Sequence, residues 1–175
     1  MLRRLSFRLS LPLVAILAMA PATLAEGTLT GEMNLEWNAC YGAPPSEEVP
    51  DWIGTVEFDD VVYDILFFNV GTGRPPTLPP LEPPMMSASE IWAIYDGLEL
   101  VYDDECAIEA FEGDIVLWGH DYGEATLPDF VLNGTVIEAS GDFANLAGHD
   151  VTISGTVELT EDGAPLAAPG EFVIG

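Results

Sequence analysis

Glu90 is the residue whose type and neighbours best suit chemistry. It precedes Trp92 and Ile94 by two and four positions in an apolar segment. Side chains alternate between the faces of a β-strand, so these three share one face. If that face points into a barrel, apolar surroundings raise the pKa of the carboxyl group and let it act as an acid or base. A strand-start charge that faces water is the alternative. Glu90 is therefore our candidate catalytic residue.

Three aromatic residues near this position are candidate ligand-binding residues. Trp92 offers a large apolar ring, and the hydroxyl groups of Tyr63 and Tyr95 could donate hydrogen bonds to a ligand. The alternative is that all three are amphipathic core residues. Their roles as ligand contacts depend on which face of each strand points inward.

Other polar clusters indicate chemistry less specifically. His120 and Asp121, beside Tyr122, combine an imidazole with a carboxylate. Neighbours in a strand point to opposite faces, so we interpret residues 120–128 as a solvent-exposed loop. His149 and Asp150 lack the further ligands that a zinc site needs. The acidic clusters at residues 47–48, 59–60 and 103–105 offer the oxygen ligands that calcium prefers, which leaves calcium binding as an alternative, but they match no EF-hand pattern. We therefore predict neither a metal site nor a cofactor.

Cys40 and Cys106 are the two cysteines of the chain. Export to an oxidising compartment would favour a disulfide between them, and two buried free thiols are the alternative. In the chain-entropy model, closing so long a loop stabilises the fold by roughly 4 kcal/mol.

Residues 1–25 have the features of a bacterial-type signal peptide. Arg3, Arg4 and Arg8 precede a short apolar run, and small residues around Ala25 offer a cleavage site. An uncleaved anchor is the alternative, although the run is short for a membrane span. We expect a secreted protein, periplasmic or extracellular, with no membrane association after cleavage.

The remaining chain is strongly acidic. All 30 acidic residues follow position 25, whereas Arg74 is the one basic residue there and lysine is absent. Such a surface repels nucleic acid and anionic membranes, so neither is an expected partner. Salt would screen the self-repulsion of so acidic a fold.

The hydrophobic pattern predicts an all-β protein with no amphipathic helix. Alternation and β-branched residues indicate about eight strands, and closing such a sheet into a barrel removes its edges. An open sandwich is the alternative. We expect one small antiparallel β-barrel domain over residues 26–175. The predicted strands cover residues 27–38, 52–58, 61–70, 89–102, 114–119, 129–139, 151–160 and 170–175.

The longest irregular stretch is a Pro-rich loop at residues 71–84. Its six prolines exclude helix and central strand. A lid over a barrel mouth and a passive surface crossing are the two interpretations.

Residues 140–148, Ser-Gly-Asp-Phe-Ala-Asn-Leu-Ala-Gly, resemble the Gly-x-Phe-x-x-x-x-Gly turn of the allene oxide cyclase and dirigent barrels. The segments around 154–157 and 169–174 are similar to strands of that family. The resemblance covers about the last third of the chain. It implies an eight-stranded barrel with an apolar interior, in which relatives cyclise an unsaturated substrate or steer radical coupling. Gly141 and Gly148 allow backbone angles that a Cβ would hinder, and Phe143 and Leu146 could tuck under the barrel end.

These observations support two hypotheses of function. The first is an exported acidic β-barrel that binds a small apolar ligand, with cyclase- or isomerase-like activity left open. The second is a non-catalytic structural or interaction module of the cell envelope or extracellular space. Under the second hypothesis, aromatic side chains such as Phe67 and Trp92 fill the barrel. The sequence leaves the oligomeric state open.

Overall fold

The computed structural model describes residues 28–41, 49–73, 85–126 and 128–175. The predicted signal peptide and residues 74–84 of the Pro-rich loop lie outside this part of the chain. The described elements are β1 (Leu29–Trp37), β2 (Trp52–Phe58), β3 (Val61–Gly73), β4 (Met85–Tyr102), β5 (Ile108–Thr126), β6 (Asp129–Ala139), the 3-10 helix η1 (Gly141–Leu146), β7 (Asp150–Thr156), β8 (Glu158–Leu159) and β9 (Pro165–Ile174).

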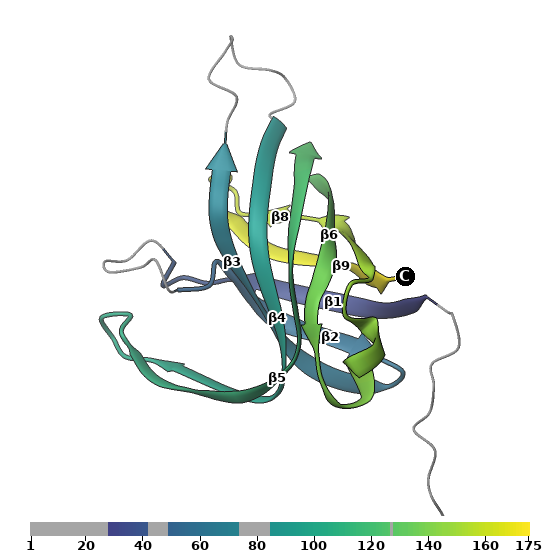
Figure 1. Ribbon diagram of the computed structural model, residues 1–175. Helices are drawn as coiled ribbons and strands as arrows, with labels where there is room; N and C mark the ends of the chain where they lie inside the picture. The colour runs from purple at the N-terminus through teal and green to yellow at the C-terminus, as the bar shows by residue number, and fades with distance from the viewer. Residues whose placement is uncertain (1–27, 42–48, 74–84, 127) are drawn as a thin grey trace, which may run out of the picture.

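The strands form a closed antiparallel barrel. Within the described residues, β1 to β7 pair in sequence order, β7 pairs with β9, and β9 pairs with β1 to close an eight-stranded sheet. The short strand β8 joins β9 outside this ring. In Figure 1, β1 and β9 run almost across the direction of β3, β4 and β5. The predicted all-β barrel of about eight strands is confirmed.

Alternation in the sequence explains the inner face. In β1, Leu29, Met33 and Leu35 are buried, whereas Thr30 and Glu32 are exposed, because the pleat sends successive side chains to opposite faces. A hairpin turn at residues 59–60 joins β2 to β3. Both aspartates of this turn have positive φ angles, as a two-residue turn of type I′ requires.

Several predicted boundaries are wrong. Strand β3 continues to Gly73, β4 begins at Met85, and β9 begins at Pro165. Strand β5 begins at Ile108 and extends through residues 120–126, which we predicted to be a loop. The polar composition of that last segment suggested a loop. However, β5 is paired with β4 on one side and with β6 on the other, so its backbone is hydrogen-bonded whatever the side chains.

One end of the barrel is filled by interlocking aromatic rings. Phe58 packs edge-on against Phe143 and Phe172, with ring centroids 5.9 and 6.1 Å apart. Helix η1 supplies Phe143 and Leu146, which are buried in the core as predicted. Gly141 and Gly148 both have positive φ angles, the backbone conformation that glycine favours.

Gly31 makes this packing possible and offers a test of it. A Cβ at Gly31 would lie 2.5 Å from Phe58 Cε1 and 2.7 Å from Val56 Cγ2. We expect Gly31→Ala to lower the free energy of unfolding by about 1–3 kcal/mol, as overpacking typically does. Chemical denaturation measures this loss.

The double variant Gly31→Ala/Phe58→Leu is the control for this prediction. The smaller side chain should make room for the added methyl group. The sum of the stability losses in the two single variants should therefore exceed the loss in the double variant. Strictly additive losses would contradict the proposed contact.

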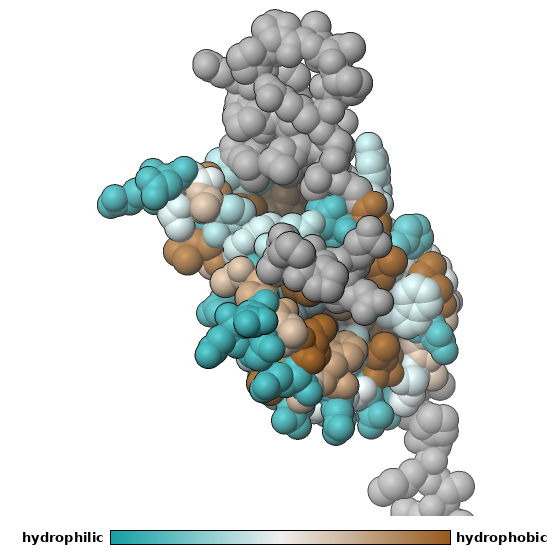
Figure 2. Space-filling view, turned by 90° about the vertical axis from the view of Figure 1, so that its left-hand side faces the viewer, coloured by the Kyte–Doolittle hydropathy of each residue, from teal (hydrophilic) through white to brown (hydrophobic). Residues whose placement is uncertain are grey.

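The β4–β5 hairpin extends beyond the barrel as an arm, here defined as residues 97–113 (Figure 1). The strand bends at Gly97, whose φ is 69°, and the pairing of β4 with β5 shifts register there. A second apolar cluster forms on the outer face of the barrel, and Leu98 and Leu100 of the arm pack against it. Its buried members are Leu66, Ala93 and Tyr95. Figure 2 views the molecule from the side on which the arm lies in Figure 1, and it shows hydrophobic and hydrophilic residues interspersed on that face.

A disulfide joins the arm to the segment after β1. Cys40 and Cys106 are bonded, with their Cα atoms 5.3 Å apart, which confirms the predicted pair. Next to it, the side-chain amide of Asn38 donates to Tyr102 Oη at 3.1 Å. A disulfide is compatible with an oxidising, exported location. The described residues include no helix with the length and apolar character needed to span a membrane.

Candidate functional site

Four polar residues form one row across the inner face of the barrel. Asn69 of β3 pairs with Glu90 of β4, which pairs with Asp121 of β5. Asp51 lies just before β2, where its backbone N–H donates to the carbonyl of Phe67 at 2.9 Å. The sheet therefore brings together three carboxyl groups that are 31 or more positions apart along the chain. We call Asp51, Asn69, Glu90 and Asp121 the carboxyl row.

The next row of the sheet is apolar and supports the carboxyl row. It runs through Trp52, Phe67, Trp92, Gly119 and Val136, each paired with the next. Gly119 leaves space for the indole ring, because a Cβ there would lie 2.4 Å from Trp92 Cζ2. The ring of Trp92 also packs edge-on against Phe172, with centroids 4.9 Å apart. The carboxyl row thus lies beside a closely packed row rich in aromatic residues.

The three carboxyl groups are removed from water. The exposed fraction is 2% for Asp51, 6% for Glu90 and 0% for Asp121. Among the described residues, no hydrogen-bond partner reaches Oδ1 of Asp51, either carboxylate oxygen of Asp121, or the indole Nε1 of Trp92. Buried polar atoms are nearly always paired in proteins, so four such atoms around one row call for a functional explanation.

Burial raises the pKa of all three groups by different amounts. The pKa of Glu90 rises from 4.5 to about 9, mainly because burial disfavours the charged form and then because Asp51 and Asp121 repel a further negative charge. The pKa of Asp121 rises to about 7, from burial and then from Asp51. A contact with the Glu90 backbone opposes this rise, although neither carboxylate oxygen of Asp121 has a hydrogen-bond partner among the described residues.

Hydrogen bonds moderate the shift of the third carboxyl group. Burial raises the pKa of Asp51 to about 6, and hydrogen bonds with backbone groups and with the Asn69 side chain oppose the rise. The segment after β1 borders this group. The pKa of Tyr41 is raised by burial first and then by the charges of Asp51 and Glu90, which places its hydroxyl group within their field.

This spread of pKa values defines what the row can do chemically. Near neutral pH, Glu90 holds a proton that it can donate, whereas Asp51 is mostly ionised and Asp121 is close to half ionised. Neighbouring titratable groups whose pKa values are pushed apart can serve as a general acid and a general base at one pH. The row therefore has the elements of proton-transfer chemistry.

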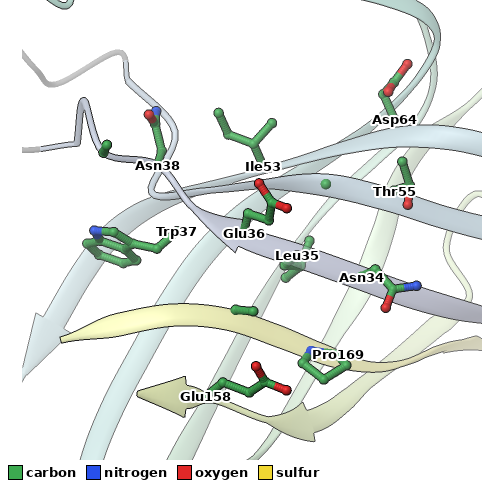
Figure 3. Close-up of a pocket in the computed structure, with 13 residues that line it drawn as sticks. Asn34, Leu35, Glu36, Trp37, Asn38, Ile53, Thr55, Asp64, Glu158 and Pro169 are labelled. Carbon is green, nitrogen blue, oxygen red and sulfur yellow. The ribbon is translucent and has the colours of Figure 1, made fainter. Parts of the chain in front are cut away.

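A concave feature lies on the outside of the barrel. It is an open groove of about 680 Å³ over β1 and β2. Figure 3 shows Glu158 at one border and Asp64 at the opposite border, with Glu36 and Thr55 between them. These side chains face solvent on the outer surface, and the groove has no buried unpaired group. We therefore place the candidate site at the carboxyl row.

The structure brings some of the predicted site residues together. Glu90 and Trp92 share the inner face, as the alternation predicted. Tyr63 is partly buried at the opposite, filled end, where its ring lies 5.4 Å from Phe143. Tyr95 belongs to the outer apolar cluster. The structure therefore does not bring Tyr63 or Tyr95 to the carboxyl row.

Sequence reasoning missed two carboxyl groups of the row. Asp121 is buried in β5, so the interpretation as a solvent-exposed loop was wrong for residues 120–126. The alternation of Leu117, Gly119 and Asp121 on one face was the signal that could have shown it. Asp51 ends a loop before β2, and nothing in its sequence neighbourhood indicated burial.

Neither a metal site nor a similarity to known proteins assigns a further role to these residues. Within the part of the chain that the structure describes, no three His, Cys, Asp or Glu side chains are grouped so that they could hold a metal ion. Comparisons with protein-family models, curated proteins and solved structures found no match to the chain. The similarity of residues 140–148 to the allene oxide cyclase and dirigent barrels stays a prediction.

Proposed function

We propose that the protein binds a small molecule at the carboxyl row and transfers protons to and from it, as an isomerase or cyclase does. The observation that supports this best is the convergence of three buried carboxyl groups with pKa values of about 6, 7 and 9. In this proposal, Glu90 donates a proton as general acid, and Asp121 accepts one as general base. The rings of Trp92 and Phe67 contact the apolar part of the ligand.

A reactive probe tests this chemistry without knowledge of the natural substrate. In 5-nitrobenzisoxazole, a base removes the proton on C3, the N–O bond breaks, and the coloured 2-cyano-4-nitrophenolate forms. We expect saturable turnover, because a desolvated carboxylate in an apolar site is a stronger base than one in water. Asp121→Asn should lower the rate by roughly 10²-fold or more, the usual contribution of a general base.

The pH profile and a matched variant sharpen this test. The rate should rise as Asp121 ionises near pH 7 and fall as Glu90 loses its proton near pH 9. Glu57→Gln removes an exposed carboxyl group on β2 and should leave the rate unchanged. A rate that matches free acetate at the same carboxylate concentration, in wild type and Asp121→Asn alike, would refute proton transfer at the row.

The filled end of the barrel favours a second candidate function. Phe58, Phe143 and Phe172 interlock there, so this part of the interior is core. A non-catalytic structural or interaction module would need only such a core. This candidate predicts no saturable turnover of the probe, which separates it from the first.

A further inference from the structure

The carboxyl row has negative charge without a positive partner in the described structure. The described residues include no Lys or Arg, since Arg74 and the arginines of the first eight positions lie outside them. The titratable groups that face the row are Asp51 before β2, Glu90 of β4, Asp121 of β5 and Tyr41 after β1. Strand β3 contributes the neutral Asn69, and the β6 residue opposite Asp121 is a glycine.

Buried hydrogen-bond acceptors and a buried donor, all without partners, surround the row. Asp51 and Asp121 together present three buried carboxylate oxygens that need donors, and the buried indole N–H of Trp92 needs an acceptor. Trp92 follows Glu90 by two positions on the same face, and its ring lies against Gly119, two positions before Asp121. The missing donors and the missing acceptor therefore belong to one neighbourhood.

We propose that the carboxyl row binds the protonated amino group of a small organic ligand that also carries an oxygen acceptor. The ammonium group offers three N–H donors to the unpaired oxygens of Asp51 and Asp121, and such charge-assisted hydrogen bonds are strong. The oxygen of the ligand accepts from the indole N–H of Trp92. This inference rests on the proposed small-molecule site and names the class of its ligand.

The alternatives fit the row less well. A metal ion needs several ligands at short, defined distances, and the described His, Cys, Asp and Glu side chains form no such group. A neutral alcohol would leave buried carboxylate charge uncompensated, which is costly in an apolar interior. An anion would be repelled by Asp51 and Asp121. An ammonium group compensates the charge and pairs the oxygens at once.

A matched set of four-carbon probes tests the inference on the full-length protein in its disulfide form. The probes are 4-aminobutan-1-ol, 1,4-butanediol and 4-hydroxybutyrate, which carry positive, zero and negative charge on the same carbon chain. Carbon-13 NMR of the Asp and Glu carboxyl groups reports binding and ionisation at each site. Sodium chloride at about 0.5 M reduces the Debye length to roughly 4 Å and suppresses attraction to the acidic surface.

We expect only the amine to shift the carboxyl signals of Asp51 and Asp121 saturably. With the amine bound, the pKa of Asp121 should fall below its free value of about 7, because a cation favours the carboxylate. Asp121→Asn should weaken binding at least 10-fold, and the exposed-site control Glu57→Gln should leave it unchanged.

Three outcomes would overturn the inference. Equal binding of the diol would refute the ammonium class and leave a small-molecule site in place. Shifts confined to exposed carboxyl groups, or lost equally in Glu57→Gln, would mean surface attraction only. Absence of binding by all three probes would refute the class, and turnover of 5-nitrobenzisoxazole would then decide separately whether the proposed function survives.

Discussion

Glu90→Gln is expected to remove a large pH-dependent loss of stability. The folded-state pKa of about 9 lies above the ordinary value of 4.5, so the native state keeps a proton that the unfolded chain releases between these values. Each pH unit in this window costs the native state about 1.4 kcal/mol, which amounts to about 6 kcal/mol over the full window. Stability is therefore highest at low pH and falls until Glu90 ionises in the native state.

The range from pH 7 to pH 9 isolates Glu90 from its neighbours. At its lower limit, Asp51, with a pKa of about 6, is mostly ionised in the native state, and Asp121, with a pKa of about 7, is close to half ionised. Their remaining titration up to pH 9 contributes only roughly 0.5 kcal/mol. We expect the wild-type free energy of unfolding to fall by about 3 kcal/mol across this range, whereas that of Glu90→Gln stays nearly constant. Urea denaturation at fixed ionic strength measures both.

The exposed-site variant Glu57→Gln is the control, and its stability should follow that of the wild type. Parallel pH dependence in the wild type and Glu90→Gln would contradict a buried, protonated Glu90. Because this test needs no ligand, it examines the site independently of the proposed function.

Loss of the disulfide is expected to have the second-largest effect. The bond links Cys40 to Cys106 across 66 positions, and the chain-entropy model assigns about 4 kcal/mol to a loop of that length. The variant Cys40→Ser/Cys106→Ser should lose about this much free energy of unfolding. Reductant should destabilise the wild type similarly and leave the double variant unaffected, and an unchanged wild-type stability under full reduction would contradict the assignment.

The disulfide should also influence the carboxyl row. Cys40 adjoins Tyr41, whose hydroxyl group lies within the field of Asp51 and Glu90. If release of the arm admits water to the row, the pKa of Glu90 should fall from about 9 toward 4.5, because hydration favours the charged form. Carbon-13 NMR of the Glu90 carboxyl group measures this change.

The variant Tyr102→Phe distinguishes the effect of the disulfide from that of the neighbouring hydrogen bond between Asn38 and Tyr102. It removes the hydroxyl group that accepts from Asn38 at 3.1 Å and keeps the disulfide. This variant should leave the pKa of Glu90 close to 9. An unchanged pKa in the reduced wild-type protein would show that the arm does not keep water from the row.

The barrel was predictable from local patterns. Alternation in β1 and in residues 151–155 requires one buried face, and two aspartates in sequence suit the turn between β2 and β3. The pairing of β1 with β9 was not encoded in any local pattern, because it joins residues near both ends of the chain. The inference of closure came from the general need to remove sheet edges.

The site was only half predictable. The spacing of Glu90, Trp92 and Ile94 determined that the three share a face, whichever way that face points. Polar composition hid the extension of β5, and with it the burial of Asp121. The position of Asp51 depends on backbone hydrogen bonds with Asn38 and Phe67, which are distant in sequence.

The sequence by itself determined the strand faces, the acidity and the pair of cysteines, because these depend on residue type and spacing alone. Only the tertiary structure decided that Asp51, Glu90 and Asp121 meet in one buried row and that Tyr95 lies on the outer face. The reason is physical: burial and mutual repulsion raise the pKa of a carboxyl group only when distant strands remove it from water and place other charges beside it.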